Sequence, residues 1–365
     1  MRTGTLRDPS PLVVGALGLL VGVVYVVRIM IPSGMDPTIM LAFGADSPVQ
    51  STYARALIGD VTVRDDFGHD GQVFFIHAND PWFLHPLSHA IHMDRPIYRG
   101  QRMGYPTIAS GLGLFPPEVV IWTLPLVNVL ALGAGSMASS RLAQVLGGST
   151  WLGLAFCLNL GVLSEVDISG GGAVALAFGV WGVLAAEQGR MWPAAGALTG
   201  AALSRETMLA SVVVLAWILW RRRIHLSWIV LALPISAVLL WGIYVRLRLS
   251  GLPSTGIREF AAFPLAGPLE AFPFWRNEPL NMLMIAAFLA VCLAFTIRAV
   301  RSQQLLAWWA LPTLLIAAVL SVSVWRYPYD IARVLAPVFL AYPFVAFIDS
   351  PDRNESQVSR LETHR

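Results

Sequence analysis

The greatest density of reactive side chains in this sequence falls in residues 65–72, which read Asp-Asp-Phe-Gly-His-Asp-Gly-Gln. The segment places three carboxylates beside a histidine, in a chain that is otherwise poor in charge. A carboxylate can accept a proton from a hydroxyl nucleophile, so acid–base chemistry is expected here. The plainer interpretations are that Asp70-Gly71 forms an ordinary turn and that Asp65-Asp66 only solvates a loop.

The composition around this segment is that of a protein embedded in a membrane. Hydrophobic residues make up 56% of the 365 residues, charged residues make up 13%, and the mean hydropathy is +0.64. A soluble domain carries about a quarter charged residues, so we expect an all-α polytopic membrane protein. The net charge of +3, without a basic tract that interleaves with aromatics, argues against a nucleic-acid partner. All 25 basic residues are arginine, whose planar fork suits phosphate, although codon bias alone can produce this composition.

Eight apolar segments approach the roughly 20 residues of a membrane-spanning helix. They are Pro11–Ile31, Pro117–Leu132, Trp151–Val166, Gly170–Ala186, Trp228–Tyr244, Pro279–Ile297, Leu305–Val324 and Leu335–Ile348. The first is too long for a cleavable signal and is expected to be a retained helix. We therefore expect one transmembrane domain over residues 1–348 with about eight full spans, followed by a short cytoplasmic tail over residues 349–365. No internal repeat is visible.

Two shorter apolar pieces lie between Arg190 and Arg221. Trp192–Leu203 and Met208–Trp220 are each too short to span comfortably, and the sequence Ser-Arg-Glu-Thr at 204–207 separates them. The simplest expectation is a helical hairpin that enters the membrane from one side and returns to it. A single broken helix together with a missed span is the alternative.

The arginines of the short connections predict which side of the membrane each loop occupies. They place both termini in the cytoplasm and the long segment 32–116 on the outer face, with short interfacial helices in it. Ser88–Met93 and Pro116–Trp122 are candidates for such helices. The turns near residues 165–170 and 325–330 and the loop 249–278 then fall on the outer side as well.

Five groups of ionisable residues are thereby expected on one side of the membrane. They are Asp65, Asp66, His69 and Asp70; Asp94, Arg95, Arg99 and Arg102; Glu165 and Asp167; Arg258 and Glu259; and Arg326, Asp330 and Arg333. Arg205 and Glu206 join them if the hairpin tip reaches the outer half of the bilayer. Carboxylates that accept a proton, next to arginine forks that hold a phosphate leaving group, suit group transfer from a phosphate ester. The alternatives are arginines that merely snorkel at helix ends and a structural Arg205-Glu206 ion pair.

Three histidines form a separate pattern. His85, His89 and His92 are spaced at i, i+4 and i+7, so a continuous helix would present them on one face, as a metal site requires. Pro86 interrupts that spacing, and we therefore expect an interfacial histidine cluster without a bound metal.

Several of these segments resemble a known family. Residues 68–75 (Gly-His-Asp-Gly-Gln-Val-Phe-Phe), followed by Asn79-Asp80-Pro81, are similar to the YDGQ first-loop signature of bacterial multi-pass GT-C-type glycosyltransferases. Residues 94–106 (DRPIYRGQRMGYP) are similar to the PAYRYQRIGYP segment of that group, and residues 203–207 (LSRET) to its L-x-R/K-E-T motif. The chain departs from the pattern at His69, where the group often has tyrosine.

The resemblance implies transfer of a sugar from a polyprenyl-phosphate donor to a cell-envelope glycan, lipid or protein on the outer face of the plasma membrane. Asp70 is the expected general base, with Asp66, Asp65 and Glu206 in reserve. The candidate phosphate ligands are Arg333, Arg326, Arg205 and Arg102, and the candidate substrate contacts are His69, Gln72, Asp65 and Tyr105. Direct displacement by the activated hydroxyl would invert the anomeric centre. A divalent ion that bridges phosphate and carboxylate is compatible with this chemistry, although the sequence does not require one.

Other classes of protein stay open at this point. A flippase of lipid-linked sugars or another secondary transporter predicts paired broken helices in corresponding halves and charges near the middle of the membrane. A non-catalytic envelope-glycan assembly protein would bind lipid-linked intermediates for a partner enzyme. An intramembrane metallopeptidase would need a histidine motif of the HExxH type, which the sequence lacks.

Overall fold

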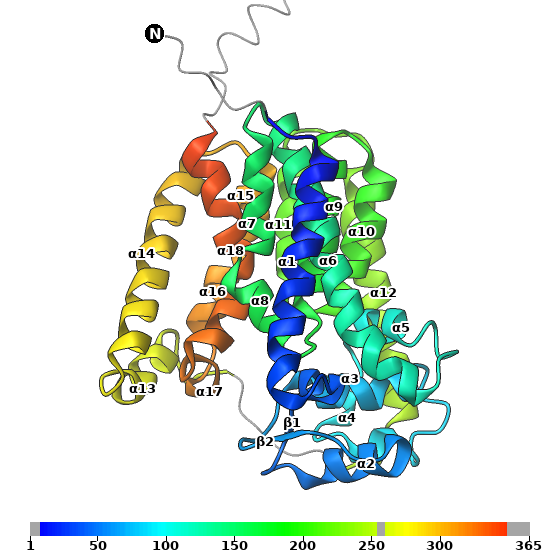
Figure 1. Cartoon of the computed structure of the whole chain (residues 1–365). Coiled ribbons are helices and arrows are strands. Elements are labelled where there is room, and N and C mark those ends of the chain that lie inside the picture. The colour runs from blue at the N-terminus through cyan, green and yellow to red at the C-terminus, as the bar shows by residue number, and fades with distance from the viewer. Residues whose placement is uncertain (1–7, 254–259, 349–365) are drawn as a thin grey trace, which may run out of the picture.

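The computed structural model describes residues 8–253 and 260–348, which are mostly helical (Figure 1). Five helices are long and apolar enough to cross a membrane. They are α1 (Pro11–Met30, prolonged by the 3-10 turn η1, Ile31–Ser33), α6 (Pro117–Val145), α12 (Ser227–Arg248), α14 (Pro279–Arg301) and α18 (Pro328–Phe347). The expected helical bundle with membrane-length helices is therefore confirmed. The predicted tail over residues 349–365 and the pair Arg258 and Glu259 lie outside the described residues.

The expected count of about eight full spans is wrong, because three of the predicted spans are shorter or broken. The segment 151–166 divides into η4 (Thr150–Gly153), α7 (Leu154–Cys157) and α8 (Leu160–Asp167). Asn159 causes the second break: its side chain accepts a hydrogen bond from the amide of Gly161 at 3.0 Å and donates one to the carbonyl of Ala336 at 2.8 Å. A polar side chain that caps a helix in this way stops the preceding one.

The other two shortened spans have equally local causes. Helix α9 (Gly172–Glu187) has 16 residues, which is about 24 Å at the usual helical rise. In the segment 305–324, α15 (Leu305–Ala310) and α16 (Pro312–Val319) follow each other as one apolar helix too short to count as a span, and α17 (Val322–Trp325) lies beyond. The chain leaves the helix at Leu320, whose backbone is extended.

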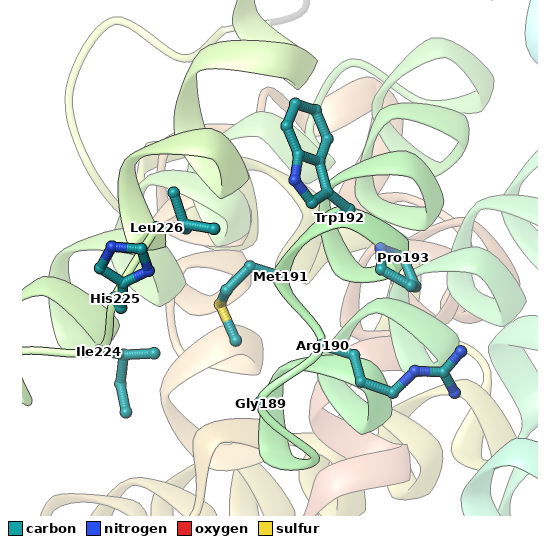
Figure 2. Close-up of a pocket in the computed structure, with 8 residues that line it drawn as sticks. All are labelled: Gly189, Arg190, Met191, Trp192, Pro193, Ile224, His225 and Leu226. Carbon is teal, nitrogen blue, oxygen red and sulfur yellow. The ribbon is translucent and has the colours of Figure 1, made fainter.

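The predicted break between two short helices is confirmed. Helix α10 (Met191–Ser204) and helix α11 (Met208–Arg221) flank Arg205, Glu206 and Thr207. Residues at and just before the start of α10, at 189–193, line a common hollow with residues that follow α11, at 224–226 (Figure 2). The start of α10 and the end of α11 therefore lie close together, as in the expected hairpin. The tip of the hairpin, at residues 205–207, points into the molecule.

The segment 32–116 gathers at one end of the bundle, opposite the N-terminus, and we call this the loop end (Figure 1). It contains the predicted short helices and one feature that the all-α prediction missed. The helices are η2 (Pro37–Leu41), α2 (Pro48–Ile58), α3 (Asp70–Asn79), η3 (Ala90–His92), α4 (Pro96–Arg99) and α5 (Gly104–Ala109). The addition is a parallel pair of two-residue strands, β1 (Phe43–Gly44) and β2 (Val63–Arg64). The segment 116–122 forms no separate helix, because it is the start of α6.

Helix α12 holds this segment against the bundle through side chains that bond to its backbone. Trp241 donates from Nε1 to the carbonyl of Gly100 at 2.8 Å, and the guanidinium of Arg248 donates to the carbonyl of Phe83 at 2.7 and 3.0 Å. Helix α13 (Ala266–Trp275) also lies at the loop end, beside α14 (Figure 1).

Candidate active site

A cluster of ionisable side chains forms where the loop end meets the apolar helices. Its members come from α3, the segment around α4, α8, the α10–α11 tip and the start of α18. We call it the arginine–carboxylate cluster. It contains Arg95, Arg99, Arg102, Arg205 and Arg333, together with Asp70, Asp94, Glu165, Glu206 and Asp330. Five guanidinium groups thus face five carboxyl groups, and residues up to 263 positions apart are in contact.

Asp70 lies at the centre of the cluster, as the first residue of α3. Its Oδ1 accepts a hydrogen bond from Arg99, its Oδ2 accepts one from Arg333, and Arg102 Nη1 lies 3.8 Å from Oδ2. Burial raises the pKa of Asp70, but Arg333, Arg99 and Arg102 outweigh burial and hold this pKa well below its usual range. Both carboxylate oxygens are therefore engaged, and the group stays ionised.

Two glycines let the start of α3 reach this position. Gly68 has a φ of +72°, which a residue with a side chain rarely adopts. A Cβ at Gly71 would lie 2.3 Å from the carbonyl oxygen of Ile168 and 2.8 Å from that of Leu41. The glycines of the 68–72 motif thus serve the close approach of backbones that places Asp70.

Glu165, on α8, is the most deeply buried carboxylate of the cluster, with 2% of its side chain exposed. Its Oε1 accepts hydrogen bonds from Arg205 Nη1 at 2.6 Å and from Arg333 Nε at 2.8 Å. Its Oε2 accepts one from the amide of Gly172, at the start of α9, at 3.0 Å. A Cβ at Gly172 would lie 2.4 Å from Glu165 Oε1, so the sequence Ser-Gly-Gly-Gly at 169–172 makes the room. Glu165 fixes the directions in which two arginines point.

The tip of the α10–α11 hairpin contributes a second buried pair. Arg102 binds Glu206 with both branches of its fork, from Nε at 2.8 Å and from Nη2 at 2.7 Å. The hydroxyl of Tyr98 donates to Glu206 Oε1 at 3.2 Å, and the Tyr98 ring lies 4.6 Å from the Arg95 guanidinium and 4.9 Å from that of Arg102. Such a bidentate pair with stacking on an aromatic ring sets the orientation of Arg102.

The cluster encloses only a small void. Asp70, Arg102, Glu165, Arg205 and Arg333 line it. Its volume is about 10 Å³, which is room for one water molecule. A ligand as large as a phosphate group therefore enters only if a lining side chain moves.

The remaining predicted residues of the 65–72 motif lie beside the cluster and have local partners. Asp66 Oδ1 accepts from the amide of Gly68 at 2.6 Å, and His69 Nε2 lies 3.8 Å from Asp66 Oδ2. Gln72 is buried. Its side-chain amide accepts a hydrogen bond from the backbone amide of Gly44 and donates one to the carbonyl of Phe67. Asp65 is exposed to solvent.

Tyr105 and Arg326 lie outside the cluster. Tyr105 is fully buried, and its hydroxyl donates to the carbonyl of Leu124 and accepts from Asn128, which ties α5 to α6. Arg326 is exposed and lies over the rings of Phe274 and Tyr327. Their proposed contacts with substrate and phosphate stay predictions.

The histidine pattern does not form a three-ligand set. His89 Nδ1 bonds to the hydroxyl of Tyr53 at 2.5 Å, and the ring of His92 packs 4.8 Å from the same tyrosine ring. Residues 85–92 form no continuous helix, because only the 3-10 turn η3 lies there. Within residues 8–253 and 260–348, no group of three or more His, Cys, Asp or Glu side chains is placed to hold a metal ion.

A larger hollow lies between the start of α10 and the segment that follows α11 (Figure 2). It has a volume of about 420 Å³ and is lined by residues 189–193 and 224–226. Figure 2 shows the side chains of Arg190 and His225 on opposite sides of it, directed apart. Its polar groups do not converge, so the arginine–carboxylate cluster is the stronger candidate for a functional site.

The sequence named Asp70, Glu206, Arg102, Arg205 and Arg333 as candidates, and the structure brings all five together. It also adds six side chains that were not site candidates: Asp94, Arg95, Arg99, Glu165, Asp330 and Tyr98. The five charged ones had been placed among the ionisable groups expected on one side of the membrane, and that signal could have led to them. Tyr98 carries no charge, but it stands between Arg95 and Arg102 in the segment 94–106 that resembles the family motif, and this place in the chain indicates its contacts. Comparisons with protein-family models, curated proteins and solved structures found no match to this chain.

Proposed function

We propose that this chain is a membrane glycosyltransferase that moves a sugar from a polyprenyl-phosphate donor to a cell-envelope acceptor. The arginine–carboxylate cluster is the proposed active site, and the loop end is the proposed outer face, with both termini in the cytoplasm. The observation that carries the proposal is the convergence of three arginine forks, Arg102, Arg205 and Arg333, on one carboxylate-lined void beside apolar helices. A fourth fork, that of Arg99, binds Asp70 beside this void.

Each part of the proposed reaction has a matching feature. The apolar helices offer a surface to the lipid tail of the donor. The arginine forks suit the phosphate, because planar guanidinium groups bind phosphate oxygens in pairs and stabilise the charge that develops on the leaving group. Asp70 is the proposed base, which takes the proton from the acceptor hydroxyl as its oxygen attacks the anomeric carbon. The bond from that carbon to the phosphate oxygen breaks, and the configuration at the carbon inverts.

The donor requirement tests this proposal. Purified protein in lipid would be offered hexoses and pentoses carried on polyprenyl phosphate, and the same sugars carried on nucleotides, together with a crude cell-envelope acceptor. We expect transfer from at least one lipid-phosphate sugar and none from the nucleotide sugars. Movement of the intact lipid-linked sugar across the bilayer without transfer would instead favour the transporter alternative, and transfer from nucleotide sugars would contradict the proposal.

A further inference from the structure

Within the residues that the structure describes, every arginine of the arginine–carboxylate cluster is already paired with a carboxylate, and Arg95 is paired with Asp94. Arg99 is shared between Asp70 and Asp94, and Arg102 between Asp70 and Glu206. Arg333 contacts Asp70, Glu165 and Asp330, and Arg205 contacts Glu165. With a void of about 10 Å³ between these groups, an anion binds only if it replaces one of the carboxylates.

The carboxylates differ in how firmly they are held. Glu165 is 2% exposed and is also bonded to the amide of Gly172, with the Cβ position of Gly170 only 1.9 Å from its Oε2. Glu206 is bound by both branches of Arg102 and by the Tyr98 hydroxyl. Of the two carboxylates that line the void, Asp70 and Glu165, Asp70 is the one that within residues 8–253 and 260–348 accepts hydrogen bonds from arginines alone. It also follows a stretch in which Asp65 and Phe67 are exposed. Of the carboxylates that line the void, Asp70 is therefore the one that can leave.

Building on the proposed function, we propose that the Asp70 carboxylate occupies the donor's phosphate position and is exchanged for the phosphate of a lipid-phosphate sugar. The phosphodiester of such a donor carries one negative charge, as the carboxylate does, so the arginines that bound Asp70 face one negative charge before and after the exchange. Arg333, Arg99 and Arg102 pass from Asp70 to the phosphate. Glu165, Asp94 and Glu206 keep the three arginines oriented throughout.

The exchange also solves a problem for the proposed base. In the closed cluster both Asp70 oxygens are engaged and its pKa is held well below the usual range, so it is a weak proton acceptor. Once the phosphate holds the arginines, the carboxylate is released beside the bound donor and its basicity returns toward that of an ordinary aspartate. The carboxylate of Asp70 thus becomes available as a base only when a donor is bound.

Binding of a lipid phosphate that carries no sugar tests the exchange without any transfer. Farnesyl phosphate would be titrated into detergent-solubilised wild type, Asp70→Asn and Asp70→Ser, with inorganic phosphate and farnesol as separate headgroup and tail probes. Because a blocked site weakens apparent affinity by the fraction that is open, we expect both Asp70 variants to bind farnesyl phosphate at least about ten-fold more tightly than wild type. Inorganic phosphate should show the same change at weaker affinity, and farnesol should show none.

Two further variants separate the possible failures. Asp167→Asn removes a carboxylate that pairs with Arg64 outside the cluster. This variant should bind farnesyl phosphate with the same affinity as wild type. Arg333→Gln should lose most of the affinity for farnesyl phosphate. If Asp70→Asn and Asp70→Ser, both folded by melting temperature, bind no more tightly than wild type, the exchange is wrong. In that case the proposed phosphate site survives only if Arg333→Gln still loses affinity, and it fails as well if Arg333→Gln binds as wild type does.

Discussion

Replacement of Arg333 with glutamine is expected to reduce sugar transfer by about 10²–10³-fold, the usual cost of losing one oriented donor at a developing charge. Arg333 is the only residue of the described chain that contacts Asp70, Glu165 and Asp330 together. Its loss leaves buried carboxylates with less compensation, so we also expect a loss of about 3–5 kcal/mol in stability. The measurements are initial rates of transfer and the melting temperature in detergent.

Two control variants make the Arg333 result specific. Arg333→Lys keeps the charge without the planar fork, so it should recover stability better than transfer. Arg276→Gln removes an exposed arginine from the C-terminus of α13, at the same end of the molecule, and both readouts should match wild type. If a folded Arg333→Gln protein transfers sugar at the wild-type rate, the arginine–carboxylate cluster has no part in the mechanism of transfer.

Replacement of Glu165 with glutamine is expected to lower stability about as much as replacement of Arg333 does. The change keeps the size of the side chain but leaves Arg205 without its carboxylate partner and weakens the hold on Arg333. Removing one partner of a buried ion pair lowers the free energy of unfolding by about 3–5 kcal/mol, because the charge of the other partner stays buried without compensation. The melting temperature should therefore fall clearly, whereas Glu118→Gln, at an exposed site in the first turn of α6, should change it little.

A double variant distinguishes the contribution of the Glu165–Arg205 ion pair to stability from the contribution of side-chain packing at Glu165. Removal of the opposing charge as well, in Glu165→Gln with Arg205→Gln, should restore part of the lost stability, because no unpaired charge is then buried. Contacting pairs of this kind show coupling energies of about 0.5–3 kcal/mol. Additive losses in the double variant would mean that Glu165 and Arg205 do not act as a pair.

The sequence predicted the constituents of the cluster better than the path of the chain through the membrane. Charged residues are rare in this chain, so those at the loop end could be expected to meet, and Asp70, Arg102, Arg205, Glu206 and Arg333 do. Their catalytic and binding roles stay predictions. The span count failed because hydropathy averages over a window and does not detect a break at one residue, such as Asn159 or Leu320.

The direction in which a side chain points was the second property that the sequence could not predict. Arg326 and Arg333 are seven residues apart and would share a face of one continuous helix. Helix α18 begins only at Pro328, so Arg326 lies before it and packs on Phe274, while Arg333 points into the cluster. In the same way, Gln72 and Tyr105 stand in recognisable motifs, yet their side chains bond to neighbouring backbone. Residue type and spacing alone could not separate such supporting residues from those that line the void.

The most direct test of the central claim is sugar transfer by Asp70→Asn and wild type, side by side, from polyprenyl-phosphate sugars in lipid. Asparagine keeps the shape of the side chain but cannot accept the proton, and each of Arg99, Arg102 and Arg333 retains another carboxylate partner. We therefore expect a folded protein whose transfer rate falls by about 10²–10⁴-fold, the range that a positioned base contributes. Equal transfer by a folded Asp70→Asn protein and wild type would contradict the account.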